Sequence, residues 1–195
     1  KLILGMRLAI VSVIFLLVLA SCEKSYQPKP KGFLALDYPE AEYKKIQLPC
    51  PYTFEINKQV EVKASVTNNP CWVDLEYPDL NGTIFITYRP VRDNLEALLI
   101  DGQKLPLQHT IKADEIEGDT YINKKNNTYG TFYEVKGDAA SQAQFYITDS
   151  VNHFLTGSIY FKTQPNYDSI VPAANYLAKD IRRIMESTKW AEIQE

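Results

Sequence analysis

The chain has 195 residues, of which 45% are hydrophobic and 23% are charged, and these proportions are typical of a folded protein rather than a disordered or fibrous one. The formal net charge at pH 7 is −3, so the chain lacks the basic excess that a nucleic-acid-binding surface normally carries. We therefore expect no nucleic-acid partner. The length favours one domain with an extension.

The N-terminal segment has the pattern of a secretion signal. An apolar run, Leu8 to Ala20, follows Arg7 and is shorter than the roughly 20 residues that a membrane-spanning helix needs. The run ends in Leu19–Cys22, which is similar to a bacterial lipobox. We predict cleavage between Ser21 and Cys22, with a lipid attached to the Cys22 thiol that anchors the chain to a membrane. The alternative is an ordinary signal peptide with an incidental cysteine.

The sequence predicts three consecutive regions. Residues 1–21 form the lipoprotein signal peptide, residues 22–32 form a Pro/Lys-rich tether, and residues 33–195 form a single α+β domain. Alternating proline and lysine disfavour a helix in the tether and favour an extended, solvated chain.

Two further cysteines, Cys50 and Cys71, remain after Cys22. A cell-envelope setting permits a disulfide between them, and two buried free thiols are the alternative. The chain has no paired Cys-x-x-Cys motif and two histidines in all, so we expect neither a metal site nor a cofactor.

The first half of the domain is predicted to be rich in strands. Apolar and polar residues alternate in Tyr52–Ile56, Val60–Val66 and Cys71–Tyr77, which indicates half-buried strands. Thr83–Tyr88 reads as another strand, and the turn at Asn81-Gly82 predicts a hairpin between it and the preceding one.

A kinked helical segment is predicted next. Leucines recur at helical spacing over Asp93–Lys104, and Asp93 with Glu96 resembles a capping box. Pro106 interrupts this pattern, and we expect a shorter helix over Leu107–Asp114.

Strands return at Tyr129–Val135, Gln144–Thr148 and Leu155–Lys162, and the last two are predicted to form a hairpin. The final element is a helix with Asp168-Ser169 at its cap and Pro172 in its first turn. Its apolar stripe predicts packing on a sheet, with binding to a partner as the alternative. The stripe comprises Ile170, Ala174, Leu177, Ile181, Ile184 and Met185.

The predicted fold is therefore an α+β domain. It consists of a mainly antiparallel β-sheet, a kinked central helical segment and a C-terminal helix packed on the sheet. The order of strands and terminal helix is similar to that of the Mog1/PsbP-like sandwich, a likeness that concerns the fold alone.

Sequence motifs for catalysis are weak. The chain contains neither a glycine-rich phosphate loop nor a zinc-protease motif. Asp149, Ser150 and His153 lie within five positions, which suits a hairpin tip rather than a catalytic triad. The acidic run Asp114–Asp119 lacks the spacing of a calcium loop and is expected to be a solvated helix end. We expect no catalytic residues, and hence a protein that is not an enzyme.

Aromatic residues are numerous, with 13 Tyr and 2 Trp. Trp72, Tyr77 and Tyr88, together with His109 and His153, are the candidates for an interaction surface. Exposed aromatic rings bind protein partners or stack on sugars. The alternative is that they decorate a sheet.

The chain contains several short stretches in a fixed order: Pro28–Gly32 with Asp37–Pro39, Cys50–Glu55, Cys71–Pro78, His109–Asp114, Phe145–Ser150 and His153–Leu155. Together they resemble the gliding motility lipoprotein GldD family of Bacteroidota, and the resemblance runs from about Pro28 to Trp190. The resemblance implies a role in gliding motility and in the linked type IX secretion machinery. It implies no catalytic residue, and the lipidated Cys22 is the one functional position that carries over.

The leading hypothesis is thus a non-catalytic, membrane-anchored component or accessory factor of the motility and secretion apparatus, whose partners are other envelope proteins and the membrane. The alternative is a periplasmic module that binds a cell-wall glycan or a small ligand. Surface-exported lipoproteins of this bacterial group usually carry an acidic run after the cysteine. Glu23 is the one acid directly after Cys22, which favours an anchor facing the periplasm.

Overall fold

The computed structural model describes residues 38–65, 67, 69–108, 112–162 and 167–191. The chain divides into two compact units, Lys1–Gly32 and Phe33–Glu195. The first unit, with the predicted signal peptide, lipid-attachment cysteine and tether, lies outside the described residues, and so does His109.

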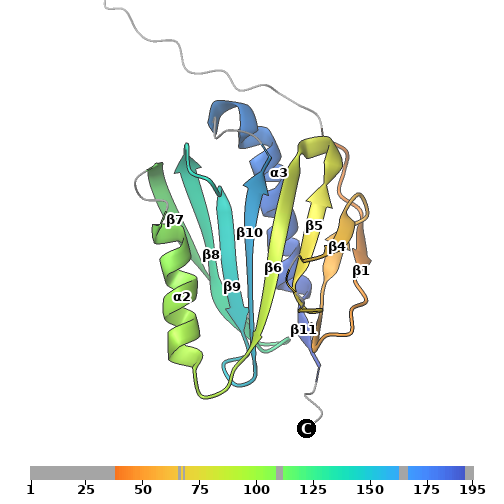
Figure 1. Cartoon of the computed structure of the whole chain (residues 1–195), viewed down its shortest axis with the longest axis vertical. Coiled ribbons are helices and arrows are strands. Elements are labelled where there is room, and N and C mark those ends of the chain that lie inside the picture. Colours follow the sequence, from red (N-terminus) through yellow and green to blue (C-terminus); the bar gives the residue numbers. More distant parts are fainter. Residues whose placement is uncertain (1–37, 66, 68, 109–111, 163–166, 192–195) are drawn as a thin grey trace, which may run out of the picture. The chain divides into compact units, whose positions relative to one another are not determined.

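The centre of this unit is a seven-stranded sheet with the order β4-β5-β6-β10-β9-β8-β7 (Figure 1). Every neighbouring pair in it is antiparallel, and both predicted hairpins, β5–β6 and β9–β10, are present. The strands are β4 (Glu61–Ala64), β5 (Val73–Tyr77), β6 (Gly82–Pro90), β7 (Ala113–Asn123), β8 (Thr128–Gly137), β9 (Ala143–Thr148) and β10 (His153–Phe161).

Two small ladders accompany the large sheet. β1 (Tyr43–Lys45) pairs with β3 (Glu55–Asn57), and β11 (Lys189–Trp190) pairs with β2 (Tyr52–Thr53). The segment predicted as one strand from Tyr52 is therefore two short strands with different partners. A short 3-10 helix, η1 (Pro78–Leu80), completes the β5–β6 connection.

Two α-helices of the described residues pack on opposite faces of the sheet (Figure 1). Successive side chains of a strand point to opposite faces, so Tyr146 and Ile147 of β9 belong to different clusters. Tyr146 packs with Leu98 of α2 (Leu95–Leu107), whereas Ile147 lies in the main core with Leu177 of α3 (Tyr167–Ser187). The predicted α+β class and the packing of the C-terminal helix on the sheet are confirmed.

The prediction of a second helix over Leu107–Asp114 is wrong. α2 ends at Leu107, one residue after Pro106, and Ala113 already begins strand β7. The long acidic strand had no apolar alternation because β7 is an edge strand whose side chains are mostly exposed. The conformation of β7 is determined by its ladder hydrogen bonds with β8, and no pattern within β7 itself predicts this pairing.

The acidic run is consequently part of a sheet edge and not a helix end. Lys136 on the neighbouring strand lies 2.8 Å from Glu115 and 2.7 Å from Glu117. Arg182 of α3 lies 2.9 Å from Asp119. These pairs reduce the repulsion among the carboxylates of β7.

The predicted helix caps and one predicted strand face also need correction. α2 is preceded by Asn94, and Asp93 has a left-handed φ of 54°, so Asp93 and Glu96 do not form a capping box. α3 begins at Tyr167, which puts Pro172 beyond its first turn. Val62 is 40% exposed because β4 is the other edge strand, although the alternation predicted a buried face.

A disulfide joins Cys50 and Cys71, with a Cα–Cα distance of 5.5 Å and a sequence separation of 21 residues. It connects the segment before β2 to the segment before β5. The hydroxyl of Tyr52 donates a hydrogen bond of 2.9 Å to the carbonyl oxygen of Cys71, which adds a second tie between the two segments.

A buried carboxylate holds α3 to the strands. Asp180 is 2% exposed and accepts hydrogen bonds from Tyr43 (2.7 Å), Tyr77 (2.8 Å) and Asn57 (3.0 Å). These donors belong to β1, β5 and β3. Burial, followed by the neighbouring Asp180, raises the pKa of both tyrosines, so each hydroxyl keeps the proton that it donates.

Replacing Asp180 by alanine leaves buried donors unsatisfied, and we expect a loss of about 3 kcal/mol in the free energy of unfolding. Urea unfolding followed by circular dichroism measures it. Lys179→Ala is the matched control, because Lys179 is the exposed neighbour on the same helix. Equal stability of the two variants would contradict a structural role for the Asp180 cluster.

The double variant Cys50→Ala/Cys71→Ala removes the cross-link from the unfolded chain, and we expect it to be less stable by about 3 kcal/mol. A thiol reductant should lower the urea midpoint of the wild type and leave that of the double variant unchanged. If the reductant shifts both midpoints equally, the disulfide does not account for the effect.

Candidate functional site

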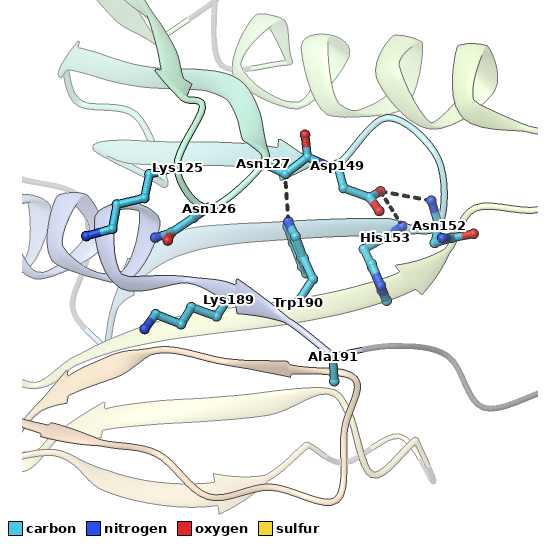
Figure 2. Close-up of a pocket in the computed structure, with 9 residues that line it drawn as sticks. All are labelled: Lys125, Asn126, Asn127, Asp149, Asn152, His153, Lys189, Trp190 and Ala191. Carbon is cyan, nitrogen blue, oxygen red and sulfur yellow. Dashed lines mark hydrogen bonds between the residues drawn. The ribbon is translucent and has the colours of Figure 1, made fainter.

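Three segments meet at one end of the sheet and line an open depression with a volume of about 570 Å³ (Figure 2). They are the β7–β8 turn, the β9–β10 turn and β11 with the residue after it. We call this feature the Trp190 depression; its lining residues are Lys125, Asn126, Asn127, Asp149, Asn152, His153, Lys189, Trp190 and Ala191.

Trp190 occupies the middle of the depression. Its indole is stacked on the imidazole of His153, with ring centroids 5.1 Å apart and an interplanar angle of 2°. Its Nε1–H donates a hydrogen bond of 3.2 Å to the carbonyl oxygen of Asn127. Because the backbone of Trp190 also pairs with Tyr52 of β2, the ring is held by three different parts of the chain.

His153 supports the indole from below the surface. It is 3% exposed, and its Nδ1 lies 2.9 Å from the hydroxyl of Tyr88. Burial lowers the pKa of His153 from 6.5, while Asp149 and the backbone of Ala191 act in the opposite direction. The imidazole is therefore neutral at pH 7 and serves as a flat, uncharged support.

Asp149 shapes the β9–β10 turn. Its Oδ1 accepts hydrogen bonds from the backbone N–H groups of Val151 (3.0 Å), Asn152 (2.8 Å) and His153 (2.8 Å). Ser150 has a left-handed φ of 69°, which suits a tight turn. The Asp149–His153 segment is thus a hairpin tip, as its spacing predicts.

Two lysines border the depression on the side of Trp190 that faces away from His153 (Figure 2). Lys125 comes from the β7–β8 turn and Lys189 from β11. Asn126 lies beside them, and its Nδ2 donates a hydrogen bond of 3.2 Å to the carbonyl oxygen of Glu186 at the end of α3. Among the described residues, neither ammonium group forms an ion pair.

The structure separates the predicted interaction residues. Tyr77 and Tyr88 are 3% and 6% exposed, with their hydroxyls bonded to Asp180 and His153. Trp72 is half-buried and donates a hydrogen bond of 2.7 Å to the carbonyl oxygen of Tyr88. Tyr77 and Tyr88 therefore belong to the core instead of an exposed aromatic surface. Of the predicted residues that the structure describes, His153 is the one that lines the depression.

Sequence reasoning missed Trp190, Lys125 and Lys189. The lysines lie in a polar turn and at a helix end, and nothing local shows that these places meet. A weak signal was present, since a bulky tryptophan follows the C-terminal helix where a polar tail would be expected. Within the described residues, no group of three or more His, Cys, Asp or Glu side chains is placed to hold a metal ion.

The family model of the gliding motility lipoprotein GldD matches residues 23–190, which is most of the chain and includes Trp190. The chain belongs to the gliding motility lipoprotein GldD family. It is therefore a lipid-anchored protein of the cell envelope that is associated with gliding motility. No curated protein matches the chain. No helix of the described residues has the length and apolar character to cross a membrane.

The lowered pKa of His153 makes the stability of this GldD-family protein depend on pH. Between the folded-state pKa and the unfolded value of 6.5, the unfolded chain binds a proton that the folded chain does not. This contribution to stability is complete above pH 6.5 and is lost as the pH falls through the folded-state pKa. We expect urea midpoints to decrease as the pH falls below 6.5, and to decrease less in His153→Gln. Equal pH dependence in both proteins would contradict this account.

Proposed function

We propose that this lipoprotein is a non-catalytic component or accessory factor of the apparatus that links gliding motility to type IX secretion. The observation that carries the proposal is the family match, which extends over almost the whole folded unit and identifies the chain with motility lipoproteins. We further propose that the lipid on Cys22 holds the domain at a membrane facing the periplasm. The single acid after Cys22, Glu23, supports this orientation.

The proposal of a non-catalytic role is supported by the way the polar groups of the depression are used. Asp149 accepts three backbone hydrogen bonds, and His153 is buried against Tyr88 and Trp190. Groups engaged in this way hold a turn and support an aromatic ring, which is a structural use and not a catalytic one. A binding role, with other envelope proteins as partners, agrees with that arrangement.

The test is a comparison in the native bacterium of a gene deletion, the wild-type protein and Cys22→Ala. We expect the deletion to abolish colony spreading and to reduce export of type IX cargo proteins. Cys22→Ala should reproduce both defects, because the unanchored domain is diluted away from the membrane machinery.

Protein levels and protease resistance of Cys22→Ala serve as the control for folding. Affinity capture of the tagged wild-type protein should recover motility and secretion proteins, and capture of Cys22→Ala should recover fewer. Normal spreading and normal export in the deletion strain would overturn the proposal.

A second candidate function is a module that binds a cell-wall glycan or a small ligand. The observation that favours it is the Trp190 depression, in which an aromatic ring and two lysines border one cavity, and neither lysine forms an ion pair with any residue that the structure describes.

A further inference from the structure

We infer that the Trp190 depression is a binding site for a sugar ring that carries a phosphate or carboxylate group. This inference deepens the second candidate function and goes beyond the proposed role in the motility apparatus, and either of the two can fail without the other. It rests on the stacking surface, the charges and the rigidity of the site.

The stacking surface is the indole of Trp190. One face of the ring is covered by the parallel imidazole of His153. In Figure 2 the opposite side of the ring is turned toward Lys125 and Asn126, across the open depression. An indole backed by a second ring is a flat apolar platform, and the C–H face of a pyranose packs on such a platform while its hydroxyls stay hydrated.

The charges at the rim select an anionic ligand. Lys125 and Lys189 come from segments far apart in the sequence and border the same cavity. An ammonium group binds phosphate and carboxylate oxygens through charge-assisted hydrogen bonds. The one carboxylate in the lining belongs to Asp149, whose Oδ1 is already occupied by three backbone N–H groups. The protein as a whole has a net charge of −3. Two lysines that have no ion-pair partner in the described part of the chain therefore make this cavity a local departure from the overall charge balance.

Hydrogen bonds hold the three segments that form the walls of the site. The indole N–H of Trp190 is bonded to Asn127, and Asn126 is bonded to the last turn of α3 through Glu186. Asp149 holds the third segment. Binding would therefore lose little conformational entropy in the walls of the site. A small entropy cost is important for a carbohydrate, because its favourable contacts are weak. The volume of about 570 Å³ accommodates a ligand of one or two sugar rings.

An acidic peptide also carries carboxylates, but the geometry favours the sugar. A side-chain carboxylate on a peptide engages the lysines and leaves the indole platform unused, whereas an anionic sugar uses both at once. The acidic peptide is therefore a competing outcome in the test.

The test follows the indole N–H signals by nitrogen-15 NMR in the full lipidated chain in detergent micelles. The chain has 2 Trp, Trp72 and Trp190, so two indole signals are expected and Trp72→Phe assigns them. N-acetylmuramic acid and N-acetylglucosamine share the same ring and differ in a lactyl ether group that carries a carboxylate, and N-acetylglucosamine phosphate supplies the phosphate arm. We expect both anionic sugars to shift the Trp190 signal saturably, with the Trp72 signal unmoved and the neutral sugar binding about tenfold more weakly.

Matched lysine variants separate the site from general surface charge. Lys125→Gln/Lys189→Gln should weaken binding of the anionic sugars by about tenfold or more and bring them to the level of the neutral sugar. Lys124→Gln is the control, because Lys124 lies in the same turn and is absent from the lining of the depression. It should bind like the wild type. Circular dichroism of each variant checks the fold.

The arms of the titration also distinguish the source of the ligand. Preference for the carboxylate sugar supports a cell-wall glycan, and preference for the phosphate sugar supports a lipid-linked glycan head group. The inference is overturned if no anionic sugar shifts the Trp190 signal, if the neutral sugar binds equally well, or if triglutamate binds as tightly as the sugars. Equal loss of binding in Lys124→Gln and the double variant would overturn it as well.

Discussion

The arrangement of this domain depends on one buried carboxylate. Asp180 receives hydrogen bonds from Tyr43, Tyr77 and Asn57, which lie on three separate strands, and so fixes both the position and the rotation of α3 on the sheet. Burying a carboxylate among neutral donors costs desolvation free energy, which the hydrogen bonds must offset. The helix can therefore shift very little, because each hydrogen bond that is lost leaves an unsatisfied polar group in the core. The apolar stripe of α3 supplies the burial, and Asp180 selects the register in which that stripe docks.

The same register determines where the chain goes after the helix. The strands β7, β8, β9 and β10 form a meander of antiparallel neighbours, so the β7–β8 and β9–β10 turns emerge at the same end of the sheet. α3 starts after β10, at the opposite end, and returns along the sheet, so that β11 arrives beside those two turns (Figure 1). Trp190 meets Asn127 and His153 for this reason. The depression is a consequence of topology, and the hydrogen bonds of Asn126, Asn127 and Asp149 hold its walls in place.

The charged side chains at the β7 edge and those at the depression have different surroundings. Three of the four acids of β7, Glu115, Glu117 and Asp119, form ion pairs with Lys136 or Arg182, which reduces the repulsion along this acidic edge. Lys125 and Lys189 have no such partner among the described residues and border the depression. This GldD-family protein thus combines a lipid-anchored location with a concave surface that carries two lysines beside an aromatic ring.

Local patterns in the sequence determined the strands that are buried on one face, both hairpins, the start of a helix near Leu95 and the C-terminal amphipathic helix. Each of these features depends on the period of the apolar side chains and on turn residues within a few positions of one another. They did not determine β7, whose acidic residues carry no apolar alternation and become a strand through pairing with β8. They also could not show that Tyr77 and Tyr88 are buried or that Trp190 lies beside Lys125, since burial and proximity depend on which elements pack together. The family resemblance could be recognised from short motifs in their order along the sequence. The site, in contrast, depends on the docking of α3, which is held by hydrogen bonds between Asp180 and residues more than 100 positions away in the sequence.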